Sequence, residues 1–130
     1  LRNARLNFRQ LEPSHIMENV IYNELRVRGF NVDVGVVPIV RRNAEGKQER
    51  VRLEIDFVCN KGSRKYYIQS AYQMLDEDKI RQEEASLRNV DDSFKKIIVV
   101  GSNIIIRRNE AGITTMGIYD FLLKENSLEL

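Results

Sequence analysis

The sequence is poor in the residues that most often reveal a function. Its 130 residues include one cysteine, Cys59, so no internal disulfide can form, and one histidine, His15, which leaves no partner for a histidine-based metal site. No apolar run approaches the ~18 residues of a membrane span, and no basic start followed by an apolar stretch predicts a signal peptide. We therefore expect no membrane partner and a cytoplasmic location, with which a single cysteine agrees.

Strong charge of one sign is also lacking. The formal net charge is +2, too small for bulk electrostatics to indicate nucleic-acid binding. A phosphate-binding loop of the pattern Gly-x-x-x-x-Gly-Lys-Ser/Thr is absent, so the chain does not bind ATP in that manner. What is present is ordinary: 42% hydrophobic and 31% charged residues, in a length that suits one globular domain.

Three segments are expected. Residues 1–13, which end at Pro13, have no clear period and predict an incoming linker or short helix. Residues 14–126 carry the regular patterns and predict the folded domain. Residues 127–130 are interpreted as a tail, of vector origin. Because the first residue is Leu1 and not Met, we expect an excised fragment of a longer protein.

The patterns inside 14–126 alternate between helix and strand. The expected elements are a helix from Ser14 to Gly29, strands near 32–38, 51–58 and 66–72, a helix over 76–89, a strand over 95–101, and short elements to 124. Three consecutive strands followed by a helical crossover predict an α/β fold, a mixed sheet flanked by helices. Strict alternation would place Ile55 and Phe57 on one face and Asp56 on the other.

One constellation could carry chemistry. Asp56 and Gln69 lie on adjoining strands, and Glu24 of the first helix could approach them. A Mg²⁺-dependent phosphodiesterase needs oxygen ligands held on rigid strands and a positive group near the reacting phosphate. The second strand would supply an acid and then, two residues later, a lysine on the same face, because side chains alternate along a strand. Here the lysine position holds Ala71.

These residues, with Glu54-Ile55-Asp56-Phe57-Val58 and Tyr67-Ile68-Gln69-Ser70-Ala71, resemble the PD-(D/E)XK restriction-endonuclease-like superfamily. With the flanking stretches 17–25 and 118–123, the chain is similar to the C-terminal domain of bacterial and archaeal AAA-type ATPases, whose function is unassigned. The resemblance implies a restriction-endonuclease-like core, Asp56, Gln69 and Glu24 as the metal-site residues, Mg²⁺ as the metal, and an upstream ATPase domain that binds ATP.

Two departures from that pattern lead to a non-catalytic expectation. Ala71 cannot replace a lysine, and Gln69 offers an oxygen without charge. We therefore expect a degenerate nuclease-like accessory domain that contacts DNA or a protein partner, or regulates the ATPase. The alternatives are an active Mg²⁺-dependent deoxyribonuclease with a migrated lysine, Lys65 or Lys79, and a pure protein-interaction module.

Structural roles compete with these assignments. Asp56 could be an ordinary strand carboxylate, Gln69 a satisfied polar strand residue, and Glu24 one half of an ion pair at the edge of the core. Geometry separates the alternatives, because a metal site of this type requires Glu24, Asp56 and Gln69 to converge within a few ångströms.

Overall fold

The computed structural model describes residues 2–73 and 77–130, with side chains at 13–73 and 81–130. The elements in chain order are α1 (Arg2–Val27), β1 (Asn31–Arg42), β2 (Gln48–Lys61), β3 (Arg64–Ala71), α2 (Glu77–Arg88), β4 (Lys95–Val100), β5 (Arg107–Arg108), β6 (Ile113–Gly117), α3 (Ile118–Leu123) and the 3-10 helix η1 (Ser127–Glu129). Residue 76, where the helix predicted over 76–89 begins, lies outside the described residues.

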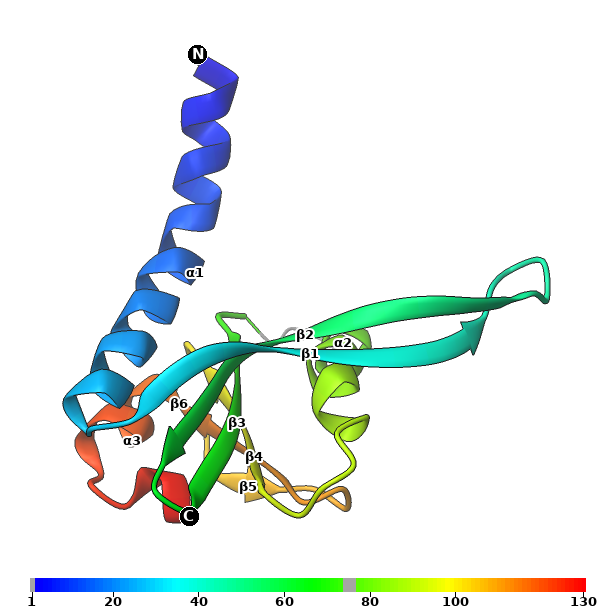
Figure 1. The fold of residues 1–130 in the computed structure, drawn as a ribbon. Coiled ribbons are helices and arrows are strands. Elements are labelled where there is room, and N and C mark those ends of the chain that lie inside the picture. The colour runs from blue at the N-terminus through cyan, green and yellow to red at the C-terminus, as the bar shows by residue number, and fades with distance from the viewer. Residues whose placement is uncertain (1, 74–76) are drawn as a thin grey trace.

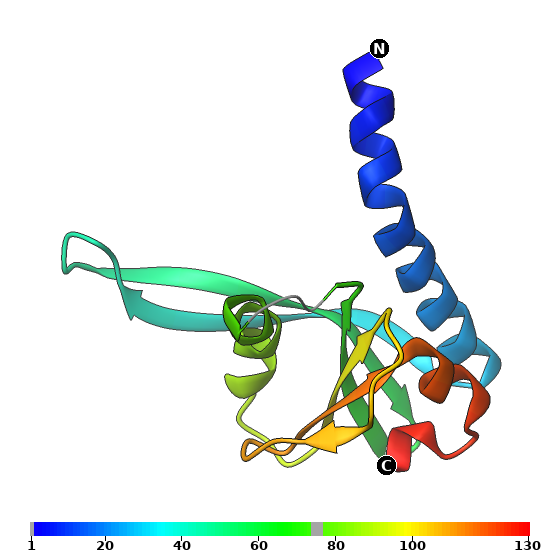
Figure 2. The same cartoon turned by 180° about the vertical axis from the view of Figure 1, so that it is seen from behind.

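The strands form one six-stranded sheet in the order β1-β2-β3-β4-β6-β5. β1, β2 and β3 make an antiparallel meander, whereas β4 and β6 continue the sheet in parallel and β5 is antiparallel. The helix α2 connects β3 to the parallel strand β4, as Figures 1 and 2 show. The predicted α/β fold with a mixed sheet and flanking helices is therefore confirmed.

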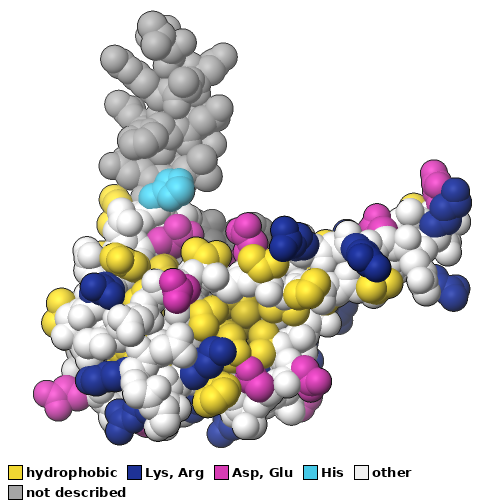
Figure 3. Space-filling model, viewed as in Figure 1, with side chains coloured by type: hydrophobic (Ala, Val, Ile, Leu, Met, Phe, Trp, Pro, Cys, Tyr) yellow, Lys and Arg dark blue, Asp and Glu magenta, His cyan; other side chains and the backbone are white. Residues whose placement is uncertain are grey.

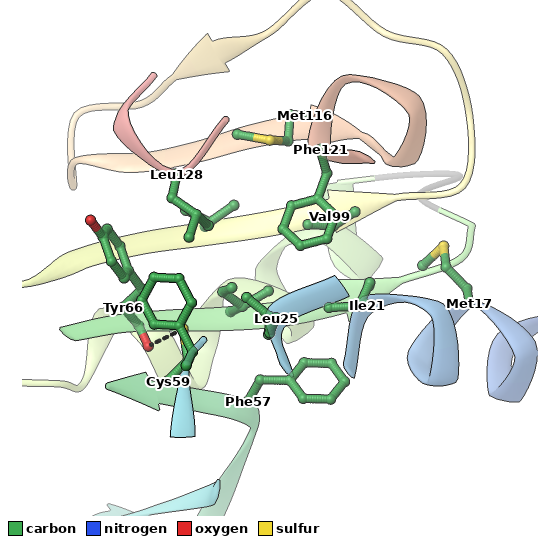
Figure 4. Close-up of a cluster of buried hydrophobic side chains, with 13 residues drawn as sticks. Met17, Ile21, Leu25, Phe57, Cys59, Tyr66, Val99, Met116, Phe121 and Leu128 are labelled. Carbon is green, nitrogen blue, oxygen red and sulfur yellow. Dashed lines mark hydrogen bonds between the residues drawn. The ribbon is translucent and has the colours of Figure 1, made fainter. Parts of the chain in front are cut away.

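Each face of the sheet has its own apolar cluster. α1, α3 and η1 cover one face, where Ile21, Phe121 and Leu128 pack on β3 and β4 (Figure 4). α2 covers the other face through Leu87. Alternation along β4 divides its side chains between the two clusters: Ile97 and Val99 lie in the first, and Ile98 and Val100 in the second. This explains why β4 is an uninterrupted apolar run.

The structure confirms the predicted end of α1 but not its predicted start. Gly29 adopts φ 92°, its N–H donates to the carbonyl of Arg26 at 3.0 Å, and the Phe30 N–H donates to Leu25 at 3.0 Å. These paired bonds satisfy the last carbonyls of the helix, as in a Schellman motif. At the other end, Pro13 lies inside α1, so the helix does not begin at Ser14 as the sequence predicts. A proline removes its own N–H from the ladder and crowds the carbonyl four residues earlier, yet the helix continues on both sides of Pro13.

Residues 127–130, interpreted from the sequence as a tail, belong to the fold. Ser127 is fully buried, and Leu128 belongs to the cluster beneath α1. The Ser127 hydroxyl donates to the carbonyl of Phe121 at 2.9 Å and accepts from Arg28 at 2.9 Å. Because these contacts join the last residues to both α1 and α3, the folded domain extends to the end of the chain.

β1 and β2 form a hairpin much longer than the rest of the sheet, and its outer part projects from the body (Figure 1). The register moves from Asp33 opposite Val58 to Gly35 opposite Ile55, so β2 holds one extra residue there. Such a bulge reverses the alternation of side chains. Ile55 therefore packs beneath α2 and Phe57 beneath α1, which corrects the shared face predicted from strict alternation.

Candidate functional site

The predicted site lies at a fork in the sheet. The pairing of β2 with β3 ends at Phe57 and Ile68, although β3 continues to Ala71 and pairs there with β4. Asp56 and Gln69 are the next residues on the two diverging strands. Backbone groups at such a fork lose their ladder partners and need others.

Gln69 and Asp56 supply those partners reciprocally. The Gln69 side-chain oxygen accepts from the backbone N–H of Asp56 at 2.8 Å, and its amide nitrogen donates to the carbonyl of Glu54 at 3.3 Å. In return, the Asp56 carboxylate accepts from the backbone N–H of Ser70 at 2.8 Å. The two side chains thus replace ladder hydrogen bonds beyond the point where the strands separate.

The neutral amide is chemically suited to this position. The backbone N–H of Asp56 requires an acceptor, and the carbonyl of Glu54 requires a donor, so the orientation of the Gln69 amide is fixed by its partners. A third bond runs from the Gln69 nitrogen to the Ser86 hydroxyl of α2 at 3.0 Å. A glutamate carboxylate has no donor and would place an oxygen against the Glu54 carbonyl. Gln69 is only 7% exposed, so its bonds are made in the interior.

Ala71 occupies the expected lysine position beneath α2. It belongs to the apolar cluster of Tyr67 and Leu87 and is 4% exposed. Gln69 projects to the same face, since it reaches Ser86. A lysine at residue 71 would therefore enter an apolar layer with no described carboxylate in that cluster to pair with it.

Asp56 lines a hollow that opens towards α1. The hollow has a volume of about 290 Å³ and is also lined by Glu18, Asn19 and Tyr22 of α1 and by Glu54 of β2. Burial raises the pKa of the Asp56 carboxyl, the Ser70 N–H opposes that rise, and the charges of Glu18 and Glu54 add to it. Asp56 therefore faces α1, whereas Ala71 packs on the opposite face of the sheet, beneath α2.

Glu24, the expected metal ligand on the helix, forms an ion pair with Arg28 instead. Its carboxylate lies 3.5 Å from the Arg28 guanidinium, and Arg28 donates to the carbonyl of Phe121 at 2.7 Å and to Ser127 at 2.9 Å. This is the ion pair at the edge of the core that was the alternative for Glu24. The helical carboxylate beside Asp56 is instead Glu18, which no pattern in the sequence singles out. Helical spacing showed which residues face the core but not which flank of α1 lies over the fork.

The three predicted ligands therefore do not form a Mg²⁺ site. Glu24 pairs with Arg28, the Gln69 oxygen accepts from a backbone N–H, and one Asp56 oxygen accepts from another. Among the residues whose side chains are described, no three His, Cys, Asp or Glu side chains form a group able to hold a metal ion. The donor set therefore does not fit the metal that the resemblance implies.

Lys65, one of the two proposed replacements for the missing lysine, falls outside this fork. Lys65 pairs with Asn60 near the start of β3, and its ammonium lies 5.3 Å from the centre of the Tyr67 ring and 5.8 Å from that of Phe94. Lys65 is five positions from Ser70, the β3 residue that contacts Asp56, and five steps along a strand span about 16 Å. The side chain of Lys79 lies outside the described residues.

Cys59 is fully buried and has no role at the fork. Its thiol contacts the carbonyl of Tyr66 at 3.6 Å, and burial raises the pKa of the Cys59 thiol to about 12. A thiol with that pKa stays protonated near neutral pH and is not a nucleophile. Cys59 therefore acts as a small apolar core residue.

Comparison with known proteins leaves the family open. No family model matches the chain. An uncharacterized protein of Haemophilus influenzae is 29% identical over 109 residues, which cover 83% of this chain and 23% of that protein. The chain thus spans about a quarter of the length of the relative it matches. None of the described helices is both long and apolar enough to cross a membrane.

Proposed function

We propose that this chain is a nuclease-like accessory domain that does not cut DNA, set in the C-terminal part of a cytoplasmic AAA-type ATPase. In that setting it would contact DNA or a protein partner, or regulate the ATPase. The order of elements supports the proposal: a helix, a three-stranded antiparallel meander, a crossover helix and a parallel strand are what a restriction-endonuclease-like core requires. Alignment with about a quarter of a longer relative agrees with a domain inside a larger protein.

One observation carries the non-catalytic assignment. All three hydrogen bonds of the Gln69 amide go to protein groups, at Asp56, Glu54 and Ser86. The residue at the second acid position of a nuclease motif is therefore used to close the fork between β2 and β3. Loss of one charge-stabilising group alone typically lowers an enzymatic rate by about 10²–10³, and here the lysine and the second acid are both replaced.

A cleavage assay tests this function. The full chain would be incubated with supercoiled plasmid and with linear DNA, in Mg²⁺ and separately in Mn²⁺, beside an Asp56→Ala variant and a Glu24→Ala variant. The proposal predicts that neither DNA is cut above the level of a chelator control. Metal-dependent cutting by the parent chain that the Asp56→Ala variant lacks would overturn it in favour of an active deoxyribonuclease, whether or not the Glu24→Ala variant still cuts.

A further inference from the structure

The outer part of the β1–β2 hairpin, residues 38–52, stands away from the domain and is here called the arm. Figures 1 and 2 show it projecting past the end of the sheet from either side of the molecule. Among the residues of the two described core clusters, none comes from the arm. A two-stranded ribbon without further support is marginally stable in water, so a long uncovered arm adds little to the stability of the domain.

The net positive charge of the chain is concentrated in the arm. It holds five basic and two acidic side chains, a net charge of +3, in a chain whose net charge is +2. The remaining 115 residues hold 16 basic and 17 acidic side chains and so carry −1. Figure 3 shows the lysine and arginine side chains spaced along the projecting hairpin. The positive charge of the domain is therefore local and lies on one exposed ribbon.

The register places three arginines on one face of this ribbon. Arg52 lies opposite Pro38, Arg50 opposite Val40, and Arg42 opposite Gln48. Alternate residues of a strand share a face, about 6.8 Å apart, so Arg50 and Arg52 are neighbours with Arg42 beyond them towards the tip.

These three arginines are not neutralised within the described part of the chain. No ion pair between described residues includes Arg42, Arg50 or Arg52. On the opposite face of the arm, Arg41 pairs with Glu49 at 3.0 Å. Like charges side by side on a sheet destabilise it slightly, so the three arginines favour a ligand that brings negative charge at regular intervals.

We propose that the arm binds the phosphate backbone of double-stranded DNA through Arg42, Arg50 and Arg52, without reading sequence. B-form DNA presents such charges in two regular rows, and its major groove, about 12 Å wide, admits a two-stranded ribbon. The arm has no aromatic residue, so it cannot stack on the bases of a single strand. The narrow major groove of an RNA duplex would not admit it.

This binding surface lies outside the Asp56 fork and does not depend on whether the fork cuts DNA. A fluorescent 20-base-pair DNA duplex of arbitrary sequence, titrated with the full chain while anisotropy is measured at several KCl concentrations, tests it. Two variants lose the same charge: Arg50→Gln/Arg52→Gln in the arm and Arg107→Gln/Arg108→Gln in β5. Urea unfolding of each variant checks that the fold is retained.

We expect the arm variant to bind about 10- to 60-fold more weakly at 0.1 M salt, and its slope of log affinity against log salt to fall by about 1.8. The β5 variant should bind within about threefold of the parent chain. A second arm variant, Arg42→Gln/Lys47→Gln, gives the same test should the first unfold.

Several results would overturn the proposal. These are absence of duplex binding, equal losses in the arm and β5 variants, and an RNA duplex or a poly-glutamate chain bound as tightly as DNA. Self-association at micromolar concentration that excludes the duplex would show that a second copy covers the arm. None of these outcomes bears on cleavage, so the proposed function and this binding surface fail separately.

Discussion

The Gln69 side-chain oxygen lies 2.8 Å from the backbone nitrogen of Asp56, and an Asp56 carboxylate oxygen lies 2.8 Å from the backbone nitrogen of Ser70. Each side chain thus bonds the backbone of the neighbouring strand just past the last ladder pair, Phe57 with Ile68. The pair therefore acts as a structural link between β2 and β3. This arrangement gives Asp56 and Gln69 a structural role that needs no lysine beside them.

Replacing Gln69 with alanine should destabilise the domain. The change leaves the Asp56 N–H and the Glu54 carbonyl unpaired at a site that is largely closed to water. An unsatisfied buried group costs about 1–3 kcal/mol, so we expect a loss of at least that size in urea unfolding. The matched control is Gln82→Ala on the exposed part of α2, which should change stability by less than about 0.5 kcal/mol. Equal stability of the two variants would contradict the structural link.

Asp56→Asn should make the domain more stable at neutral pH. The pKa of Asp56 is raised chiefly by burial, so the folded state binds this proton more tightly than the unfolded state does. The stability from this group is therefore fully present below the ordinary pKa of 3.8 and is lost as pH rises through the folded value. Asparagine stays neutral and can still accept from Ser70. Its advantage over the parent chain should shrink on acidification; an advantage that grows at low pH would contradict this sign.

Restoring the missing lysine should not restore a nuclease. Ala71→Lys places a long charged side chain in the apolar cluster beneath α2, and we expect a loss of about 3 kcal/mol in urea unfolding. The control Ala111→Lys lies in an exposed turn and should be nearly neutral. The combined Gln69→Glu/Ala71→Lys variant should be less stable still and should not cut plasmid in Mg²⁺. Metal-dependent cutting by that variant would show that the fork retains a usable active-site geometry.

The C-terminal residues should contribute strongly to stability. Leu128 is 4% exposed and packs in the cluster beneath α1, so Leu128→Ala should cost about 2–5 kcal/mol. Leu123, at 79% exposed, supplies the control, and Leu123→Ala should cost less than about 0.5 kcal/mol. Urea unfolding of both variants gives the comparison. A Leu128→Ala variant as stable as the parent chain would contradict this prediction and would indicate that residues 127–130 are an appended tail.

Local signals in the sequence predicted much of this fold. The glycine stop at Gly29, the alternating strands and the apolar run of β4 each report directly on backbone conformation or burial. The meander and crossover followed from the order of those elements. Gly46, in the loop between β1 and β2, adopts φ 79°.

The errors have physical causes that act at longer range. The bulge near Asp56 changes the faces of Ile55 and Phe57, and nothing in an alternating pattern marks one extra residue. Which of Glu18 and Glu24 lies over the fork depends on how α1 is rotated on the sheet. The burial of Leu128 depends on contacts with segments about 100 residues away, and a short terminal stretch carries no period that would reveal them.

The most direct test of the central claim is whether Asp56 binds a divalent metal ion. Mn²⁺ would be titrated into the isotopically labelled chain while the amide signals of Asp56 and Ser70 are followed by NMR, with Asp56→Asn and Glu24→Gln variants beside it. If Asp56 and Gln69 form only a structural link, Mn²⁺ should cause no more saturable broadening of these amide signals in the parent chain than in the Asp56→Asn variant. Saturable broadening at Asp56 and Ser70 that disappears in Asp56→Asn would show a metal site at the fork and contradict the account.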